Sequence, residues 1–374
     1  MSVGASTLAE SARLGWSRTL STGALVAGAA ISVVSLLALA GTDQLGWDFR
    51  YTYLRAAALV MHGGSPYPPL DDAVLGSGTA YVYPPQLAVV LAPVTNLPAD
   101  VVVWLAFCAA VAALVGALAL LGVRDVRCYL ALLAWGSTSS ALEMTNLSAF
   151  LVLAIALVWR FRGTVWPFAA MLALVVSTKL FGWPLFVWAV ATRRPRAAIL
   201  AIVLGIAVPM CAWAVIGFAD ITRYPELLRR FSEVQGEQKS YSIVAAVVAL
   251  GCSPAVGQAL AFVVGACLLA ASVYFGWRTG DDVRSFAAAI GATLAFTPVL
   301  WLHFFVLLAV PLAIARPRFS AIWLLPIVLW VCPRADNGEG LQPFLPAIVS
   351  SILLAVVLTR ADERWWPKTV EAGA

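Results

Sequence analysis

The chain has 374 residues, of which 62% are hydrophobic and 11% are charged, and its net charge is +5. Soluble domains are about 45–50% apolar and about 25% charged, so this composition argues against a soluble enzyme, a disordered chain and a nucleic-acid-binding protein. The sequence therefore predicts an integral membrane protein, with residues 1–374 forming one membrane domain and no nucleic acid as a partner.

Apolar runs long enough for membrane spans recur along the chain. We interpret the first as an uncleaved signal anchor, because its apolar run is longer than that of a typical signal peptide. No ten-residue segment alternates in polarity, which favours helices over a barrel. The prediction is an all-α, polytopic membrane helix bundle of about twelve spans, at roughly 20–41, 99–123, 128–142, 146–159, 164–178, 180–192, 197–217, 254–277, 285–301, 303–315, 319–333 and 342–359. Shorter pieces near 84–97 and 241–252 are predicted as re-entrant or interfacial helices.

Positive charges indicate how the bundle is oriented. Basic residues concentrate in cytoplasmic loops, and most of the 24 Lys and Arg residues fall in one alternate set of connections, including Arg160, Arg162, Arg193 and Arg194. This distribution predicts a protein of the cell membrane with both termini in the cytoplasm. The long segments 42–84 and 217–242 are then external loops, where binding and chemistry usually lie.

The first external segment opens with a candidate catalytic residue. Asp48–Met61 has the pattern of a helix that follows the first span, with Asp48 in its first turn. A carboxylate there is favoured by the helix dipole, so capping explains its presence. The alternative is a general base at the external membrane boundary, where Asp48 would deprotonate a hydroxyl.

Aromatic residues give this segment a second possible role. Tyr51 follows Asp48, Tyr67 lies in a Gly-Gly-Ser-Pro-Tyr turn, and Tyr83 lies in a Tyr-Val-Tyr-Pro-Pro stretch. Glycine permits a sharp turn and X-Pro steps favour an extended backbone. The tyrosines either dock an ordered surface loop or stack on a sugar, and are candidate substrate contacts.

Ionisable residues in apolar runs suggest function, because each costs free energy in lipid. Lys179 lies between two apolar runs, and His303 opens another, both on the external side of the predicted topology. Lys179 either extends its ammonium to the interface or binds a lipid phosphate as a point charge. His303 is either a buried, hydrogen-bonded side chain or a proton donor or phosphate contact.

Four more polar residues fall on the external side. Glu143 and Asn146 lie in a tight turn, where helix capping explains both and substrate contact is the alternative. Arg223 and Lys239, in the second external loop, are candidate phosphate contacts. The sequence has no P-loop, no HExxH and no Asp-x-Asp pair, and it therefore predicts no cofactor and no metal.

Several short motifs occur together in a particular order. They are Asp48-Phe49, Gly64-Ser65-Pro66-Tyr67, Tyr81-Val82-Tyr83-Pro84-Pro85, Thr145-Asn146-Leu147, Lys179 before a run ending in Arg193-Arg194, and Thr297-Pro298 ahead of His303. In this order and spacing, over roughly residues 20–320, the chain resembles glycosyltransferase family 87. That family consists of membrane enzymes of the GT-C class.

The resemblance implies a specific reaction. The donor is a polyprenyl-phosphate sugar, most often mannose and in some members arabinofuranose, and the acceptor is a glycolipid or glycan on the outer face. The anomeric carbon is inverted, Asp48 is the base, and Lys179 and His303 bind or protonate the leaving lipid phosphate. Many relatives have Gly-Gln before the asparagine and proline after the lysine, where this chain has Met144-Thr145 and Leu180.

Two other classes fit the composition. A transporter or lipid flippase typically shows inverted repeats and broken midplane helices, whereas the sequence shows no clear repeat and places its candidate charges at one face. A non-catalytic structural or chaperone-like membrane protein would also carry long charged external loops.

Overall fold

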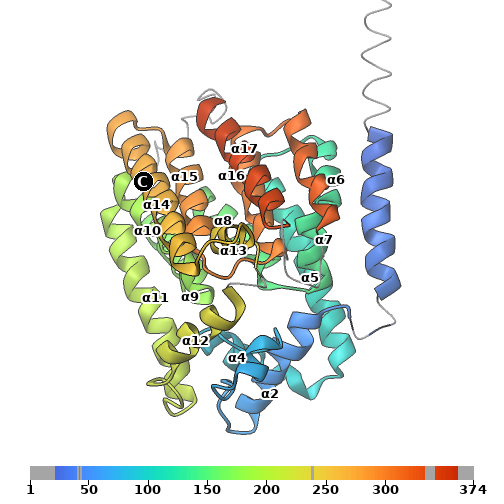
Figure 1. The fold of residues 1–374 in the computed structure, drawn as a ribbon, viewed down its shortest axis with the longest axis vertical. Helices are drawn as coiled ribbons and strands as arrows, with labels where there is room; N and C mark the ends of the chain where they lie inside the picture. The colour runs from blue at the N-terminus through green and yellow to red at the C-terminus, as the bar shows by residue number, and fades with distance from the viewer. Residues whose placement is uncertain (1–21, 40–41, 43, 237–239, 333–341, 361–374) are drawn as a thin grey trace, which may run out of the picture.

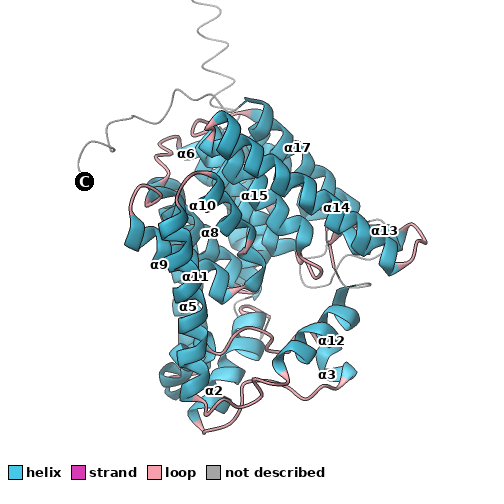
Figure 2. Cartoon of the chain, turned by 90° about the vertical axis from the view of Figure 1, so that its left-hand side faces the viewer, coloured by secondary structure: helices cyan, strands magenta, loops and turns pink. Residues whose placement is uncertain are grey.

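The computed structural model describes residues 22–39, 42, 44–236, 240–332 and 342–360. Throughout these residues the regular structure is helical, and no strand is assigned (Figures 1 and 2). The all-α class is therefore confirmed for the described part of the chain. Its first helix, Thr22–Leu39, matches the first predicted span and stands at one side of the bundle in Figure 1.

The segment between the first two predicted spans folds into short helices. The expected helix over Asp48–Met61 is confirmed, and its first half has π-helical hydrogen bonding. The short helix predicted near 84–97 is also present. The elements are η1 (Asp48–Leu54), α2 (Arg55–Met61), α3 (Asp72–Gly76), α4 (Gln86–Leu91) and η2 (Ala92–Asn96).

The middle of the chain forms a helix over every predicted apolar run. The run at 128–142 is divided at Trp135, where the backbone is extended between two helices. The elements are α5 (Ala99–Leu120), α6 (Val126–Ala134), α7 (Gly136–Glu143), α8 (Leu147–Arg160), α9 (Val165–Thr178), η3 (Leu180–Gly182), α10 (Pro184–Ala191) and α11 (Pro195–Val215).

The last third corrects one expectation. Segment 217–242 was predicted as a loop, yet it contains the 13-residue helix α12 (Tyr224–Gly236), which buries Leu227 and Phe231 and exposes its charged residues. This amphipathic pattern is short and sits among charges, so hydropathy alone hides it. The remaining elements are α13 (Ile243–Ala249), α14 (Pro254–Val273), η4 (Tyr274–Thr279), α15 (Asp282–Phe296), η5 (Leu302–Leu308), α16 (Ala309–Ala315), η6 (Ala321–Val331) and α17 (Phe344–Arg360).

Among the described residues, fewer than the predicted twelve helices are long enough to cross a membrane by themselves. Four described helices are long and apolar enough to cross a membrane, and a fifth arises if α7 and α8, bent by 115°, count as one span. Several other apolar helices have 10–17 residues. A helix of about 20 residues spans the hydrocarbon core, so the count of twelve stays a prediction.

Local sequence signals explain where many helices begin. Asn146, Ser242 and Asp281 precede α8, α13 and α15, and each side chain accepts a backbone N–H of the first turn. Helices α10, α11 and α14 instead begin with proline, whose missing N–H would have no partner in that position. These signals act within one turn, which is why the sequence located the helices well.

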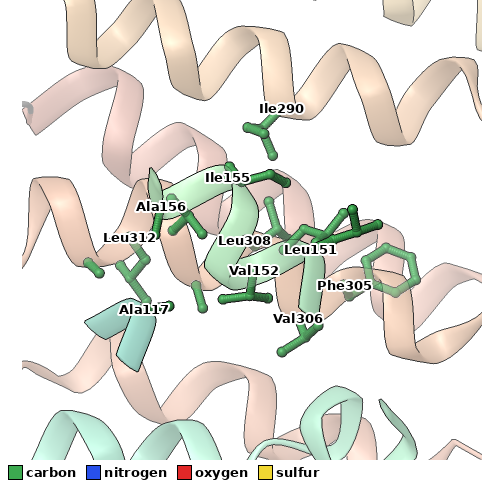
Figure 3. Packing of buried hydrophobic residues seen from close by; sticks show 14 of the residues in the cluster. Ala117, Leu151, Val152, Ile155, Ala156, Ile290, Phe305, Val306, Leu308 and Leu312 are labelled. Atoms are coloured by element: carbon green, nitrogen blue, oxygen red, sulfur yellow. The ribbon is translucent and has the colours of Figure 1, made fainter. Parts of the chain in front are cut away.

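Helix α8 lies in the middle of the hydrophobic core. Figure 3 shows Leu151, Val152 and Ile155 of this helix between side chains of neighbouring elements. Phe305 of η5 and Ile290 of α15 are among those neighbours, and all five side chains are buried. Because α8 is fixed on several sides, the residue at its N-terminus has a well-defined position in the fold.

Two segments far apart in the sequence form one end of the molecule. Helix α3 contacts α12, and α2 packs on α4; Figure 1 shows α2 and α4 at the same end of the molecule as α12, and Figure 2 shows α3 beside α12. Arg230 forms an ion pair with Asp72 at 2.6 Å, and the Tyr224 hydroxyl donates to the Val82 carbonyl at 3.0 Å. We call this end, made of residues 44–98 and 217–236, the site end.

A charge cluster marks the opposite end of α8. Asp282 accepts from Arg162 at 3.0 Å, from Arg194 at 2.7 Å and from the Trp188 indole at 2.9 Å. Helix α8 runs from Asn146 toward this cluster over 14 residues, a length of about 21 Å. We call this end, defined by Arg162, Arg194 and Asp282, the arginine end. It joins two of the connections that the sequence identified as basic.

Candidate functional site

The site begins with the π-helical turn that carries Asp48. A π-helix closes its hydrogen bonds over five residues, so Asp48 and Tyr53 face a common neighbour. That neighbour is Asn146, whose amide Nδ2 lies 2.5 Å from Asp48 Oδ2 and 3.0 Å from the Tyr53 hydroxyl. Asp48 is partly exposed and Tyr53 is fully buried. The unusual helix thus directs two polar groups to one amide.

A sharp bend places Asn146. Between α7 and α8 the chain turns through Thr145, which has φ +46°, a left-handed conformation that is rare for a β-branched residue. Asn146 then caps α8, with Oδ1 accepting the Ser148 N–H at 2.9 Å. Since Oδ1 must accept this N–H, Nδ2 must point toward Asp48. The cap therefore fixes which end of the amide meets the carboxylate.

Asn146 connects Asp48 to Lys179. The Lys179 ammonium donates to Asn146 Oδ1 at 3.1 Å and to the Ser148 hydroxyl at 3.4 Å. Both hydrogens of the Asn146 amide and its oxygen are thereby engaged with protein groups, and the residue is fully buried. Asn146 was predicted to contact substrate, but here it is a bridge between a carboxylate and an ammonium.

Burial changes the acidity of Asp48. Asp48 keeps some exposure, but the surrounding protein removes much of its contact with water, and this raises the pKa of the carboxyl to about 6, from its ordinary value of 3.8. The hydrogen bond from Asn146 and the positive charge of Lys179 act in the opposite direction and limit the rise. A carboxyl with a pKa near 6 is ionised at neutral pH and is still basic enough to take a proton from a hydroxyl as it reacts.

Lys179 is held in an aromatic environment. Its side chain is 4% exposed, and Nζ lies 3.8 Å from the centre of the Phe304 ring, a cation–π contact. His303 packs against the same ring, with centroids 4.8 Å apart, and is also buried. Its Nε2 has no hydrogen-bond partner among the described residues. Phe304 thus lies in contact with both predicted phosphate-binding residues.

A groove of about 310 Å³ opens beside Lys179. Its lining comes from three separate parts of the chain and from α12. The residues are Val82–Pro84, Lys179–Phe181, Trp183, Phe296–Val299, and Leu228, Phe231 and Ser232 of α12. Leu180 and Trp183 line the groove and are 46% and 39% exposed, so it reaches the surface of the apolar bundle. The lining is apolar and aromatic apart from Lys179, Tyr83, Ser232 and Thr297.

A row of tyrosines leads away from the site. Successive ring centroids are 5.4 Å apart from Tyr53 to Tyr83, 5.6 Å from Tyr83 to Tyr81, and 6.0 Å from Tyr81 to Tyr67. Tyr67 continues to Tyr224 of α12 at 5.2 Å. Tyr83 lies on the groove, whereas Tyr67 lies in the aromatic contact between the two halves of the site end.

The other predicted site residues lie outside this network. Tyr51 packs on Trp47 with ring centroids 4.5 Å apart, and Glu143 is buried, with its main-chain carbonyl accepting a backbone N–H. Arg223 pairs with Asp220 at 2.8 Å and is half exposed. Lys239 lies outside the described residues. The described part of the chain also holds no cluster of three or more His, Cys, Asp or Glu that could bind a metal ion.

Three residues of the network escaped the sequence analysis. Tyr53 lies five positions after Asp48, a spacing that points to a common face only in a π-helix. Ser148 follows Asn146 at the start of α8, where a serine usually indicates no more than helix capping. Phe304 follows His303 and looks like any apolar core residue. Each becomes recognisable only once its tertiary neighbours are known.

Comparison with known proteins bears on this arrangement. The family model for glycosyltransferase family 87 matches residues 81–300, more than half of the chain. The match contains Asn146, Lys179 and the groove, while Asp48 and His303 lie outside its limits. No curated protein and no solved structure matches the chain.

Proposed function

Since the chain belongs to glycosyltransferase family 87, a family of membrane glycosyltransferases, we propose that it transfers a sugar from a polyprenyl-phosphate donor. The acceptor is a hydroxyl of a glycolipid or glycan at the outer face of the cell membrane. The observation that carries this proposal is the hydrogen-bonded series Asp48, Asn146 and Lys179 beside an apolar groove. It supplies a base and a cation at neighbouring points, which are the two groups that this transfer needs.

The reaction is a single displacement at the anomeric carbon. Asp48 accepts the proton of the acceptor hydroxyl as its oxygen bonds to that carbon. The bond between the anomeric carbon and the phosphate oxygen breaks, and its electron pair stays on the phosphate. Lys179 stabilises the charge that develops there, and His303, close to the same ring, is a second contact or a proton donor. Attack opposite the leaving group inverts the anomeric carbon.

The groove supports a donor with a lipid tail. Its aromatic and aliphatic lining suits an isoprenoid chain, and its opening at Leu180 and Trp183 lets such a chain enter from the bilayer. Lys179 at the inner side suits the phosphate as a point charge. The resemblance discussed above favours mannose as the sugar, with arabinofuranose as the alternative.

The test is sugar transfer by the purified protein in liposomes. Radiolabelled polyprenyl-phosphate mannose and polyprenyl-phosphate arabinofuranose are each supplied with a lipid-extract acceptor. We expect transfer from one of them, and we expect Asp48→Asn to lower it at least about 100-fold, the contribution typical of a general base. Glu226→Gln, an exposed carboxylate on α12, serves as the matched control and retains activity.

Three results would contradict the proposal. Full activity of Asp48→Asn would show that Asp48 is not the general base. Use of a water-soluble nucleotide sugar would show that the donor is not lipid-linked. Sugar movement across the liposome membrane without transfer would indicate a transporter instead of an enzyme.

A further inference from the structure

Tyr83 links the Asp48 network to the groove. Its ring lines the groove together with Lys179, and Lys179 Nζ lies 5.6 Å from the centre of the Tyr83 ring. Its hydroxyl lies 3.5 Å from the Tyr53 hydroxyl. Tyr83 therefore touches both the hydrogen-bond network and, like Lys179, the groove.

The hydrogen bonds of this network have one direction. The Asn146 amide can only donate through Nδ2, so the Tyr53 oxygen accepts from it at 3.0 Å. Tyr53 is fully buried, and its own proton points to the Tyr83 oxygen. The Tyr83 oxygen thus accepts, and its proton has no acceptor among the described residues. A hydroxyl held in this way presents a donor to a ligand in the groove.

We propose that the Tyr83 hydroxyl is a second donor, beside Lys179, to an oxygen of the lipid-linked phosphate, and that Tyr53 is a positioning residue that sets its direction. This inference rests on the proposed function. An ammonium and an O–H donor that line the same groove favour an anionic oxygen as their ligand, since hydrogen bonds to charged acceptors are about twice as strong as neutral ones. Apart from Ser232 and Thr297, the rest of the groove is apolar and suits the tail.

The same contact would favour the reaction. When the anomeric bond breaks, the phosphate gains negative charge, and a donor already aimed at its oxygen binds the transition state more tightly than the substrate. Tyr83 gives a hydrogen bond and keeps its proton, so no further reactant is needed. This role differs from sugar stacking, which uses the ring face and not the hydroxyl.

Direct binding separates these roles. Farnesyl phosphate and farnesol, which share an isoprenoid tail, are titrated into the purified full-length protein. We expect Tyr83→Phe, which keeps the ring, to weaken farnesyl phosphate about tenfold or more, the usual worth of a hydrogen bond to a charged group, and to leave farnesol unchanged. Tyr129→Phe removes a hydroxyl bonded to Val123, outside the site end, and is the matched control.

A double-mutant cycle tests the role of Tyr53. We expect Tyr53→Phe alone to weaken farnesyl phosphate about threefold, and to have no further effect in the Tyr83→Phe background, because Tyr53 acts through Tyr83. Equal effects of Tyr53→Phe in both backgrounds would overturn the positioning role. Equal weakening of both ligands by Tyr83→Phe, or of neither, would overturn the donor role.

The outcome for the unaltered protein keeps the two proposals apart. If it binds farnesyl phosphate no more tightly than farnesol, the lipid-phosphate donor itself is wrong. If it prefers the phosphate and Tyr83→Phe retains that preference in full, only the assignment of Tyr83 is wrong.

Discussion

At the scale of single residues, the most informative side chain is Asn146. It joins a carboxylate, an ammonium and a phenol through one buried amide, and all its hydrogen-bonding groups are used. Such a residue has no free hydrogen-bonding group for a substrate, yet it holds Asp48 in place and limits the rise in pKa that burial causes. A polar network of this kind is stable only when every member is satisfied, so small changes in it have large effects.

The acidity of Asp48 predicts how activity depends on pH. A general base acts in its ionised form, and the pKa of Asp48 is raised to about 6, so kcat/KM should fall as pH drops through about 6. Below that value the fall should approach tenfold per pH unit. The measurement is the pH profile of sugar transfer between about pH 4.5 and 8.

A variant of Asn146 tests whether Asp48 is the group that titrates. Asn146→Ser keeps a good helix cap but removes the amide that donates to Asp48. That hydrogen bond lowers the pKa of Asp48, so its loss should move the acid limb to higher pH. An acid limb that stays in place, or moves to lower pH, would show that Asp48 is not the group that titrates.

At the scale of elements, the site depends on how the start of η1 docks on the turn after α7. The Gly46 N–H donates to the Glu143 carbonyl at 2.7 Å, and the Phe49 N–H donates to the Met144 carbonyl at 3.3 Å. These bonds flank Asp48 on one segment and lead directly to Asn146 on the other. These backbone hydrogen bonds therefore fix the register between the two segments independently of their side chains.

Gly46 tests this register. It has φ +74°, and a Cβ at this position would lie 2.5 Å from Val103 Cγ1. Gly46→Ala should therefore shift the segment that carries Asp48 and lower the rate of transfer about 100-fold, since misplacement by about 1 Å has effects of that size. The measurement is kcat of the purified variant at saturating donor.

Two further variants make the result specific. Gly122→Ala has a similar φ of +78° with no atom near the added Cβ, so it reproduces the backbone strain without the clash. Val103→Ala in the Gly46→Ala background removes the clashing methyl and should recover part of the rate. Equal losses in Gly46→Ala and Gly122→Ala, without recovery, would refute the docking explanation.

At the scale of the whole molecule, two ends with different chemistry face opposite ways along α8. The site end gathers Asp48, the tyrosines and α12, whereas the arginine end joins Arg162 and Arg194 to Asp282. From the excess of basic residues in one set of connections, we propose that the arginine end is the cytoplasmic one. The proposed reaction then takes place at the external surface.

Cysteine accessibility tests this orientation. Glu226→Cys on α12 and Thr164→Cys beside Arg162 place exposed thiols at the two ends, in a chain whose six natural cysteines are replaced by serine. A membrane-impermeant maleimide should label Glu226→Cys on intact cells and Thr164→Cys only after permeabilisation. The reverse pattern would place the site in the cytoplasm and contradict a reaction at the outer face.

The sequence by itself determined the solvent of this protein and most of its helices. Hydropathy and helix caps act over one or two turns, so the predicted apolar runs coincide with helices, with ends that differ by a few residues. It also singled out Lys179, because a charge in an apolar run is costly, and Asp48, because it opens the helix after the first span. Their roles stay predictions. The family resemblance drawn from short motifs is confirmed by the match over residues 81–300.

Only the tertiary structure decided how these residues work together. Asp48 and Asn146 are 98 positions apart, and their contact depends on a π-helical turn, a left-handed Thr145 and the docking of Gly46. None of these follows from local propensity, because each is stabilised by packing between distant segments. Tyr53 and Tyr83 are likewise distant in the sequence. Only in the folded protein does the Tyr53 hydroxyl donate to the Tyr83 hydroxyl, beside the groove that Tyr83 lines.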